Sequence, residues 1–157
     1  MRVQEVKPFE KEGSKKQQIE KMFDDISGRY DFLNHFLSFG IDRAWRKKTI
    51  LEVSAVKHDN ILDIATGTAD LAIAESALNP DKVVGLDLSE KMLEVGRQKI
   101  AKKGIKNIEM VKGDSENLPY DEGSFDVVTV AFGVRNFENL KKGLGEMSRV
   151  LTKGGKL

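Results

Sequence analysis

Two carboxylates and one glycine in the segment "LDIATGTADLA" (62–72) could bind a cationic ligand. A dinucleotide-binding turn needs three glycines, which let the backbone approach a pyrophosphate at the start of a helix. Here the three positions are Ala65, Gly67 and Asp70, and Asp63 adds a second acid. Asp70 would repel a phosphate. Acids on either side of a single glycine, where the backbone can come close to a ligand, suit a cation instead. The structural alternative is that Asp63 accepts backbone hydrogen bonds and Asp70 is an acid favoured at a helix N-terminus.

Asp87, Asp114 and Ser115 extend this pattern. Asp87 lies in "KVVGLDL" (82–88), about 20 residues after the glycine turn, where a carboxylate can accept both hydroxyls of a ribose. Asp114 is the last residue of "NIEMVKGD" (107–114), and Ser115 follows it. There the two residues can recognise an exocyclic amine and a ring nitrogen. The structural alternatives are a capping acid and a Gly-Asp turn. Together the acids predict an adenine-like, ribose-containing cation without phosphate, and S-adenosylmethionine meets each condition.

Strand and helix patterns alternate along residues 57–157 and would bring these side chains together. The expected strands are 60–65, 82–88, 107–114 and 124–132, and the expected helices are 70–78, 90–103 and 138–151. The strands are apolar on both faces, so we expect an α/β fold with a doubly wound, mostly parallel, Rossmann-like sheet. A further strand would begin at Gly154-Gly155, where the chain ends, so the sequence predicts a core truncated after strand four.

The residues before this core divide into two segments. Residues 1–14 are charged and unpatterned, which predicts a loose arm, and residues 15–56 carry helical spacing, which predicts a lid or cap. Ser27-Gly28 is expected to break the first helical run, and a second helix is expected near 43–56. The aromatic and leucine side chains of the cap are interpreted as core, or alternatively as contacts to a bilayer, with nearby cations facing lipid phosphates. They are Phe32, Leu33, Phe36, Leu37 and Phe39, with Arg43, Arg46, Lys47 and Lys48.

Composition excludes several classes of function. The formal net charge of +1 gives no field that would favour nucleic acid. The chain has no cysteine, which excludes disulfides and thiolate chemistry, and its two histidines, His35 and His58, lie far apart, so no metal site is expected. Neither a signal peptide nor an apolar run long enough to span a membrane is present, which predicts a cytoplasmic protein, peripheral at the inner face of the membrane if the cap binds lipid.

The motifs resemble those of a known family. The pattern from Asp63 through Gly67 and Thr68 to Asp70, followed by Asp87 and Asp114, looks like a class I S-adenosylmethionine-dependent methyltransferase. The segments "YDFLNHFLSFGIDRAW" (30–45), "FGVRN" (132–136) and "RVLTKGG" (149–155) resemble the demethylmenaquinone/ubiquinone C-methyltransferase family. The resemblance covers the chain from about Lys15 onward.

The resemblance implies C-methylation of a prenylated naphthoquinol, demethylmenaquinol to menaquinol, with S-adenosylmethionine as methyl donor. It implies catalytic positions at Arg135, Asn136 and Tyr30, and a cofactor crevice formed by Asp63, Gly67, Thr68, Asp70, Asp87, Leu88, Asp114 and Ser115. The alternatives are a ubiquinone-pathway or other small-molecule methyltransferase, and a cofactor-binding but inactive fragment. A Rossmann dehydrogenase is disfavoured by the missing phosphate turn.

Three departures from the family pattern bear on the site. The turn usually reads Gly-Gly-Thr-Gly-Asp, whereas here Ala69 precedes Asp70, which makes it stiffer. Ala131 stands where relatives can offer a serine hydroxyl, and Asp42 where they often carry histidine. The implied partner is a lipid-soluble quinol, with no nucleic acid, and an unpaired sheet edge predicts self-association into a homo-oligomer.

Overall fold

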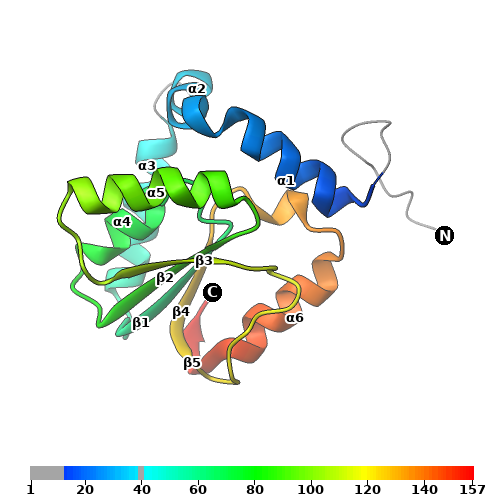
Figure 1. The fold of residues 1–157 in the computed structure, drawn as a ribbon. Helices are drawn as coiled ribbons and strands as arrows, with labels where there is room; N and C mark the ends of the chain where they lie inside the picture. The colour runs from blue at the N-terminus through cyan, green and yellow to red at the C-terminus, as the bar shows by residue number, and fades with distance from the viewer. Residues whose placement is uncertain (1–12, 39–40) are drawn as a thin grey trace.

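The computed structural model describes residues 13–38 and 41–157. One parallel sheet of five strands, in the order β3-β2-β1-β4-β5, runs through the centre of the molecule, with helices on both faces (Figure 1). The strands are β1 (Asn60–Ile64), β2 (Lys82–Asp87), β3 (Ile108–Lys112), β4 (Phe125–Val130) and β5 (Leu151–Lys156). The order reverses between β1 and β4, which is the switch point where such sheets bind ligands. The predicted doubly wound α/β fold is confirmed.

The helices lie close to their predicted positions. They are α1 (Lys15–Ile26), α2 (Tyr30–Leu37), α3 (Ile41–Ser54), α4 (Asp70–Ser76), α5 (Glu90–Lys102) and α6 (Leu140–Val150), with short 3-10 turns η1 (Ser27–Arg29) and η2 (Val134–Asn136). η1 interrupts the first helical run at Ser27-Gly28, as the sequence predicts.

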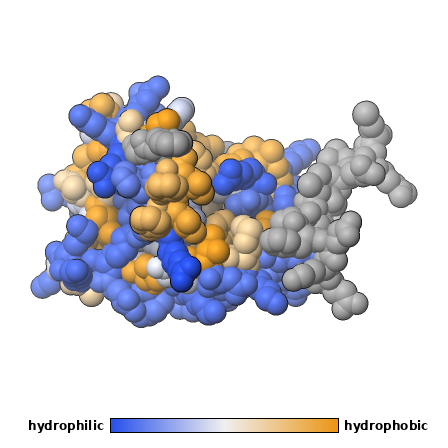
Figure 2. Space-filling model, turned by 90° about the horizontal axis from the view of Figure 1, so that it is seen from above, coloured by the Kyte–Doolittle hydropathy of each residue, from blue (hydrophilic) through white to orange (hydrophobic). Residues whose placement is uncertain are grey.

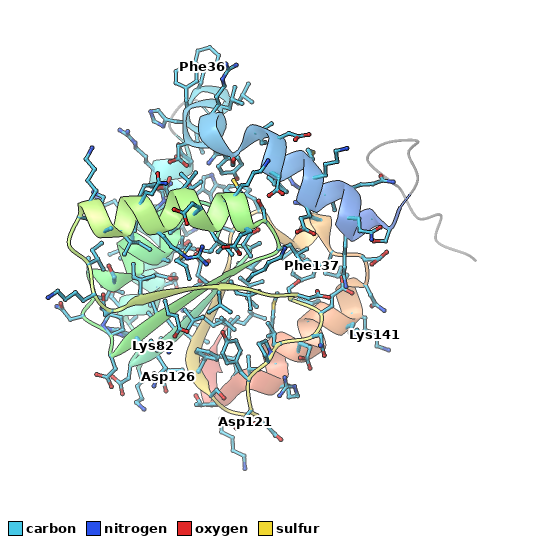
Figure 3. The ribbon with its side chains drawn as sticks, viewed as in Figure 1. Phe36, Lys82, Asp121, Asp126, Phe137 and Lys141 are labelled. Atoms are coloured by element: carbon cyan, nitrogen blue, oxygen red, sulfur yellow. The ribbon has the colours of Figure 1, made fainter. Side chains whose placement is uncertain are left out.

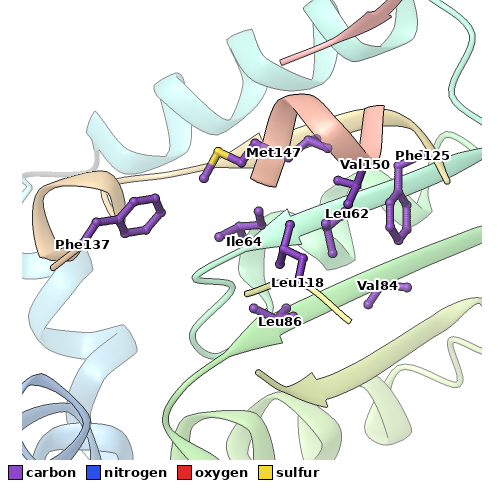
Figure 4. Packing of buried hydrophobic residues seen from close by; sticks show 10 residues of the cluster. Leu62, Ile64, Val84, Leu86, Leu118, Phe125, Phe137, Met147 and Val150 are labelled. Carbon is purple, nitrogen blue, oxygen red and sulfur yellow. The ribbon is translucent and has the colours of Figure 1, made fainter. Parts of the chain in front are cut away.

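Successive side chains of each strand point to opposite faces of the sheet, which produces two apolar clusters. Leu62, Val84 and Val128 face α6 and pack with its Met147 and Val150 (Figure 4). Their neighbours along the strands pack on the other face, against α3, α4 and α5; they are Ile61, Val83 and Val127, with Val53, Ala72 and Ile100. Because helices cover both faces, the three central strands are apolar on both sides.

β5 differs from the sequence prediction. It begins directly after α6, three residues before Gly154-Gly155, so the sheet continues past its fourth strand. Its pairing with β4 shifts register between Leu151 and Lys156, and Gly154 adopts a left-handed φ of 80° within it. A short polar strand with two glycines lacks the apolar, β-branched pattern by which strands are recognised.

The N-terminal helices are less buried than predicted. Ser14 caps α1 in a capping box with Gln17, so it belongs to the helix; residues 1–12 of the predicted arm lie outside the described residues. Phe32, Phe36 and Leu37 are 70%, 65% and 71% exposed, so their assignment to the core is wrong. Phe39 lies outside the described residues.

The exposed side chains of α2 form a continuous apolar surface. Phe32 and Phe36 stack with ring centroids 5.9 Å apart, as residues four apart on a helix can, and Phe36 extends away from the sheet (Figure 3). Seen from above, apolar side chains gather over this end of the molecule (Figure 2). We name Phe32, Phe36, Leu37 and Ile41 the α2 patch. Within residues 13–38 and 41–157, no helix is long and apolar enough to cross a membrane.

Candidate functional site

A cavity of about 770 Å³, open to solvent on one side, lies where the carboxyl ends of β1, β2 and β4 meet α1. We call it the first cavity. It includes five of the predicted cofactor residues and all three predicted catalytic residues; these are Gly67, Asp87, Leu88, Asp114 and Ser115, with Tyr30, Arg135 and Asn136. The topology brings them together because the ends of parallel strands lie along one edge of the sheet.

The turn after β1 leaves space for a ligand at Gly67. Gly67 has a φ of 58°, and a Cβ there would lie 3.4 Å from Met92 Cε and 3.8 Å from Tyr30 Cε1. Ala65 and Ala69 also have positive φ values, 55° and 69°. Alanine pays about 1–2 kcal/mol for this conformation, so the turn is held in a strained shape. Any side chain at Gly67 would therefore project between Met92 and Tyr30 into the first cavity.

Asp87 connects this turn to the end of β2. Its Oδ2 accepts a hydrogen bond from Gly67 N at 2.8 Å, and its Oδ1 accepts one from Ser89 N at 2.9 Å. Burial raises the pKa of Asp87, and the two backbone N–H groups oppose that rise. Each carboxylate oxygen has a second acceptor position, so the group can also accept two hydrogen bonds from a ligand.

Asp114 contacts α1 across the first cavity. Its Oδ2 accepts from Lys16 Nζ at 2.7 Å, and its Oδ1 accepts from Glu116 N at 2.8 Å. Lys16 also pairs with Glu116 at 3.1 Å. Glu116 is almost fully buried, and its Oε1 accepts from the backbone N–H groups of Glu138 and Asn139. This cluster joins the cap to the loops after β3 and β4.

Thr68 and Asp70 do not line the first cavity. They line a second cavity, of about 1230 Å³ including its open side, that lies under α2 and α3. Asp70 pairs with Lys99 Nζ and, at 3.2 Å, with Arg46 Nη2. Thr68 Oγ1 donates to Asp31 and accepts from Lys99 Nζ at 3.2 Å. These side chains are thus engaged by protein partners that connect the turn to α2, α3 and α5.

Asp63 also lines the second cavity and belongs to a buried acid pair. It is 1% exposed and accepts a hydrogen bond from Thr66 Oγ1 at 2.7 Å. Thr129 Oγ1 lies 3.4 Å from Asp63 Oδ1 and donates to Glu75 Oε1 at 2.8 Å. Glu75 is fully buried, and its Oε2 has no hydrogen-bond partner among the described residues.

Burial raises the pKa of Asp63 to about 7, and the hydroxyls of Thr66 and Thr129 oppose that rise. Burial also raises the pKa of Glu75, and the neighbouring Asp63 carboxylate adds to the effect. Two carboxylates so close in a low dielectric do not both ionise near neutral pH. The pair therefore retains a proton.

Tyr30, Arg135 and Asn136 approach the first cavity from the cap and from η2. Arg135 is exposed and has no ion pair with any residue that the structure describes. Burial raises the pKa of Tyr30, the Asp87 carboxylate adds to the rise, and the Arg135 charge opposes it. Tyr30 therefore stays protonated at neutral pH. The neighbouring Arg135 guanidinium can stabilise a negative charge on a ligand.

Sequence reasoning missed three residues of this region. Lys16 and Glu116 line the first cavity and pair with each other, yet they are 100 positions apart in the chain. Phe132 lines both cavities. Its position within "FGVRN" was the only signal for it. The described residues include no group of three or more acidic or histidine side chains that could hold a metal ion.

Comparisons with known proteins agree with this geometry. Residues 11–157 match the ubiE/COQ5 methyltransferase family. The chain is 47% identical over 156 residues to a demethylmenaquinone methyltransferase of Bacteroides fragilis, and 45% identical over 157 residues to one of Porphyromonas gingivalis. In both cases the match covers 98% of this chain and 64% of the relative, so the chain spans about two-thirds of the length of these relatives.

Solved structures show the same fold. A crystal structure of a putative methyltransferase from Bacillus halodurans is 36% identical, with a TM-score of 0.63, and the match covers 69% of this chain and 47% of that one.

The buried acid pair predicts how stability depends on pH. The raised pKa means that the folded state holds a proton that the unfolded state releases between the ordinary value of 3.8 and about 7. Stability from this proton is complete below that window and is lost as the pH rises through it. We expect Asp63→Asn, which does not titrate, to gain thermal stability relative to the parent protein as the pH rises from about 5 to about 8.

The exposed Asp81→Asn serves as the control, because Asp81 lies at the opposite end of the sheet. Unfolding temperatures measured by circular dichroism across this range test the prediction. A difference between Asp63→Asn and the parent that stays constant with pH would contradict it.

Proposed function

Because the chain belongs to the ubiE/COQ5 methyltransferase family, we propose that it transfers a methyl group from S-adenosylmethionine to a ring carbon of a prenylated naphthoquinol, converting demethylmenaquinol to menaquinol. The observation that carries this proposal is the first cavity, which is lined by the Asp87 carboxylate and by the Arg135 guanidinium, for which the described residues provide no ion pair. The names of the relatives support the naphthoquinol as substrate.

The residues of the first cavity fit this cofactor. The free acceptor positions of Asp87 suit the two ribose hydroxyls, and Gly67 leaves the space that a side chain would fill. Asp114, Ser115 and Leu88 line the same cavity, which supports the proposal that the first two contact the adenine and that Leu88 contributes apolar surface. Direct cofactor contacts from Asp63, Thr68 and Asp70 stay predictions. Because protein partners already engage them, we propose that these three hold the turn in its strained shape.

S-adenosylmethionine supplies a methyl group on a positively charged sulfur. With the cofactor bound, the ring carbon would form a bond to the methyl carbon while the carbon–sulfur bond breaks and its electrons go to sulfur. The ring carbon would then lose its proton to solvent and the quinol oxygen would regain one, so that one proton is released overall. The protein must hold the reacting carbons about 3–3.5 Å apart. The quinol hydroxyl must also lose a proton to solvent, because its electrons make the ring carbon nucleophilic.

Arg135 and Tyr30 support this step through charge and hydrogen bonding. An arginine has too high a pKa to act readily as a base, but its guanidinium can stabilise the phenolate that forms. The protonated Tyr30 can donate a hydrogen bond to the same oxygen, and Asn136 can orient the ring.

Two alternatives are retained. The acceptor can be a benzoquinol of the ubiquinone pathway or another small molecule. A second candidate function is cofactor binding without turnover, because the residues proposed to bind the cofactor line the first cavity whether or not an acceptor binds. Self-association through the edge strands β3 and β5 stays a prediction.

The cofactor assignment predicts the behaviour of Asp87→Ala. This variant loses two charge-assisted hydrogen bonds to the ribose, each contributing roughly 1.5–3 kcal/mol, so most of the affinity for S-adenosylmethionine should disappear. Isothermal titration calorimetry measures the affinity, and circular dichroism confirms that the variant folds. Asp81→Ala, at the exposed opposite end of β2, should bind as the parent does. Unchanged binding by a folded Asp87→Ala would refute the assignment.

The reaction itself is tested with a short-chain demethylnaphthoquinol kept reduced under anaerobic conditions. Mass spectrometry and NMR of the product should show one new methyl group on the ring carbon. Arg135→Gln should lower kcat by about 100-fold while leaving cofactor affinity unchanged, since the guanidinium acts on charge that develops during transfer. Lys141→Gln, at an exposed position of α6, is the control cation. Methylation at the phenol oxygen would support a different methyltransferase, and tight cofactor binding without turnover would support the second candidate.

We also propose that the cap contacts the bilayer that holds the prenyl tail. The α2 patch is exposed, and Arg43, Lys47 and Lys48 on the adjoining α3 are exposed as well. Apolar side chains flanked by cations bind surfaces that carry anionic lipids.

This contact predicts that Phe32→Ser with Phe36→Ser lowers the fraction of protein that floats with anionic phospholipid vesicles by several-fold. Stability should change little, because both rings are already exposed. Leu144→Ser, an exposed position on α6, should float as the parent does. Equal flotation of the double variant and the parent would rule out the α2 patch as the contact.

A further inference from the structure

The two cavities adjoin each other, and we call the region that they share the junction. Five residues line both of them: Tyr30, Ala65, Gly67, Ala131 and Phe132. If the cofactor occupies the first cavity, as proposed above, a methyl group can reach the second cavity only past these side chains. The largest apolar side chain among them is Phe132.

Phe132 is held in an unusual conformation. Its φ of 62° is left-handed, which costs a bulky residue of the order of 1–3 kcal/mol. Its side chain is nevertheless 58% exposed and takes no part in either apolar cluster. Burial of the ring therefore does not offset the free-energy cost of this backbone conformation.

The neighbouring backbone imposes this conformation. A Cβ on Gly133 would lie 2.4 Å from Ala65 Cβ and 3.4 Å from Val130 Cγ2, so the loop is pressed against the turn after β1. Asn136 N then donates to Gly133 O at 2.9 Å and starts η2. The close packing at Gly133 and the hydrogen bond to its carbonyl fix the backbone next to Phe132, whose ring lies at the junction.

The second cavity is suited to a fused aromatic ring with hydroxyl groups. Trp45, Leu71 and Val130 provide apolar surface, and Asn34, Thr49 and Thr66 provide polar atoms. The lining also includes the charged or acidic side chains of Asp42, Arg46, Asp63 and Asp70, which pair with protein partners or are buried. Such a mixture of apolar walls and a few polar groups is typical of sites for small organic ligands. An exposed phenylalanine at its inner end adds a surface on which an aromatic ligand can stack.

We propose that Phe132 is the stacking surface for the methyl acceptor. The acceptor ring enters through the second cavity and lies against Phe132, with its reacting carbon directed at the junction beside Gly67. Arg135, three residues further along the same loop, then faces the ring from the first cavity. The inference rests on the proposed methyl transfer and adds the path and the contact of the acceptor.

Trp45 offers a direct measurement, because it lines the second cavity and is the one tryptophan of the sequence. Titration with 2-methyl-1,4-naphthoquinone should quench its fluorescence. Phe132→Leu should weaken this binding by about 3- to 10-fold, and Phe132→Tyr should retain it, since an aromatic ring is what stacks. Phe36→Leu, which removes an exposed ring outside both cavities, should bind as the parent does.

Phe132→Gly separates binding from folding. Glycine tolerates the left-handed φ, so this variant should unfold at the same or a higher temperature than the parent while binding the naphthoquinone at least as weakly as Phe132→Leu. In turnover, both variants should raise KM for the quinol more than they lower kcat. Their affinity for S-adenosylmethionine should stay within about twofold of the parent.

The outcomes distinguish this inference from the proposed function. If the parent methylates the quinol and the Phe132 variants have unchanged KM and unchanged quenching, the role of Phe132 is refuted and the function stands. If the parent binds S-adenosylmethionine but neither binds the naphthoquinone nor methylates the quinol, the proposed function fails. If the parent methylates the quinol without quenching of Trp45, the acceptor does not use the second cavity.

Discussion

The hydrogen bonds that Asp87 accepts from Gly67 and Ser89 connect the parts of the molecule on which the rest depends. They fasten the strained turn after β1 to the end of β2, which places the open space at Gly67 beside the buried carboxylate. The backbone at Ala65 and Ala69 is costly in this shape, so the turn would relax if the carboxylate did not hold it. The pressed loop at Gly133 in turn depends on the position of Ala65. Together with the bond from Thr66 N to Leu86 O, these hydrogen bonds fix the turn that lines both cavities.

α1 is attached to the core largely through polar contacts, whereas α3 packs on the sheet through the buried Val53. α1 is joined by Lys16 to Asp114 and by Glu20 to Lys112, and its Asp24 accepts a hydrogen bond from Ser89 Oγ. Of its apolar residues only Ile19 is buried. Ion pairs that are partly exposed contribute little and weaken with salt, whereas the apolar clusters do not depend on them. The sheet and α1 thus differ in what stabilises them.

Much of the fold could be predicted because it depends on local periodicity. The central strands and their helices carry strong patterns, and the break at Ser27-Gly28 follows from residue type. β5 could not be predicted from its polar, glycine-containing sequence. The acids were recognised by type and position, but their partners were not. Lys99 and Arg46 reach Asp70 from helices 29 and 24 positions away, and only the structure shows that they occupy it. The exposure of Phe32 and Phe36 was missed because helical spacing does not say whether a partner surface exists.

The contact between Lys16 and Asp114 attaches α1 to a carboxylate that lines the first cavity, so the proposed ligand contact of Asp114 would be coupled to the attachment of α1. Asp114 is one carboxylate serving two partners, the ammonium of α1 and whatever ligand approaches the loop after β3. By reciprocity, a ligand that competes for that carboxylate loosens α1 by the same free energy that α1 subtracts from its affinity. The measured affinity is then a difference between two attachments. Salt would weaken the ion pair between Lys16 and Asp114, and it would thereby change the affinity for a ligand that competes for Asp114.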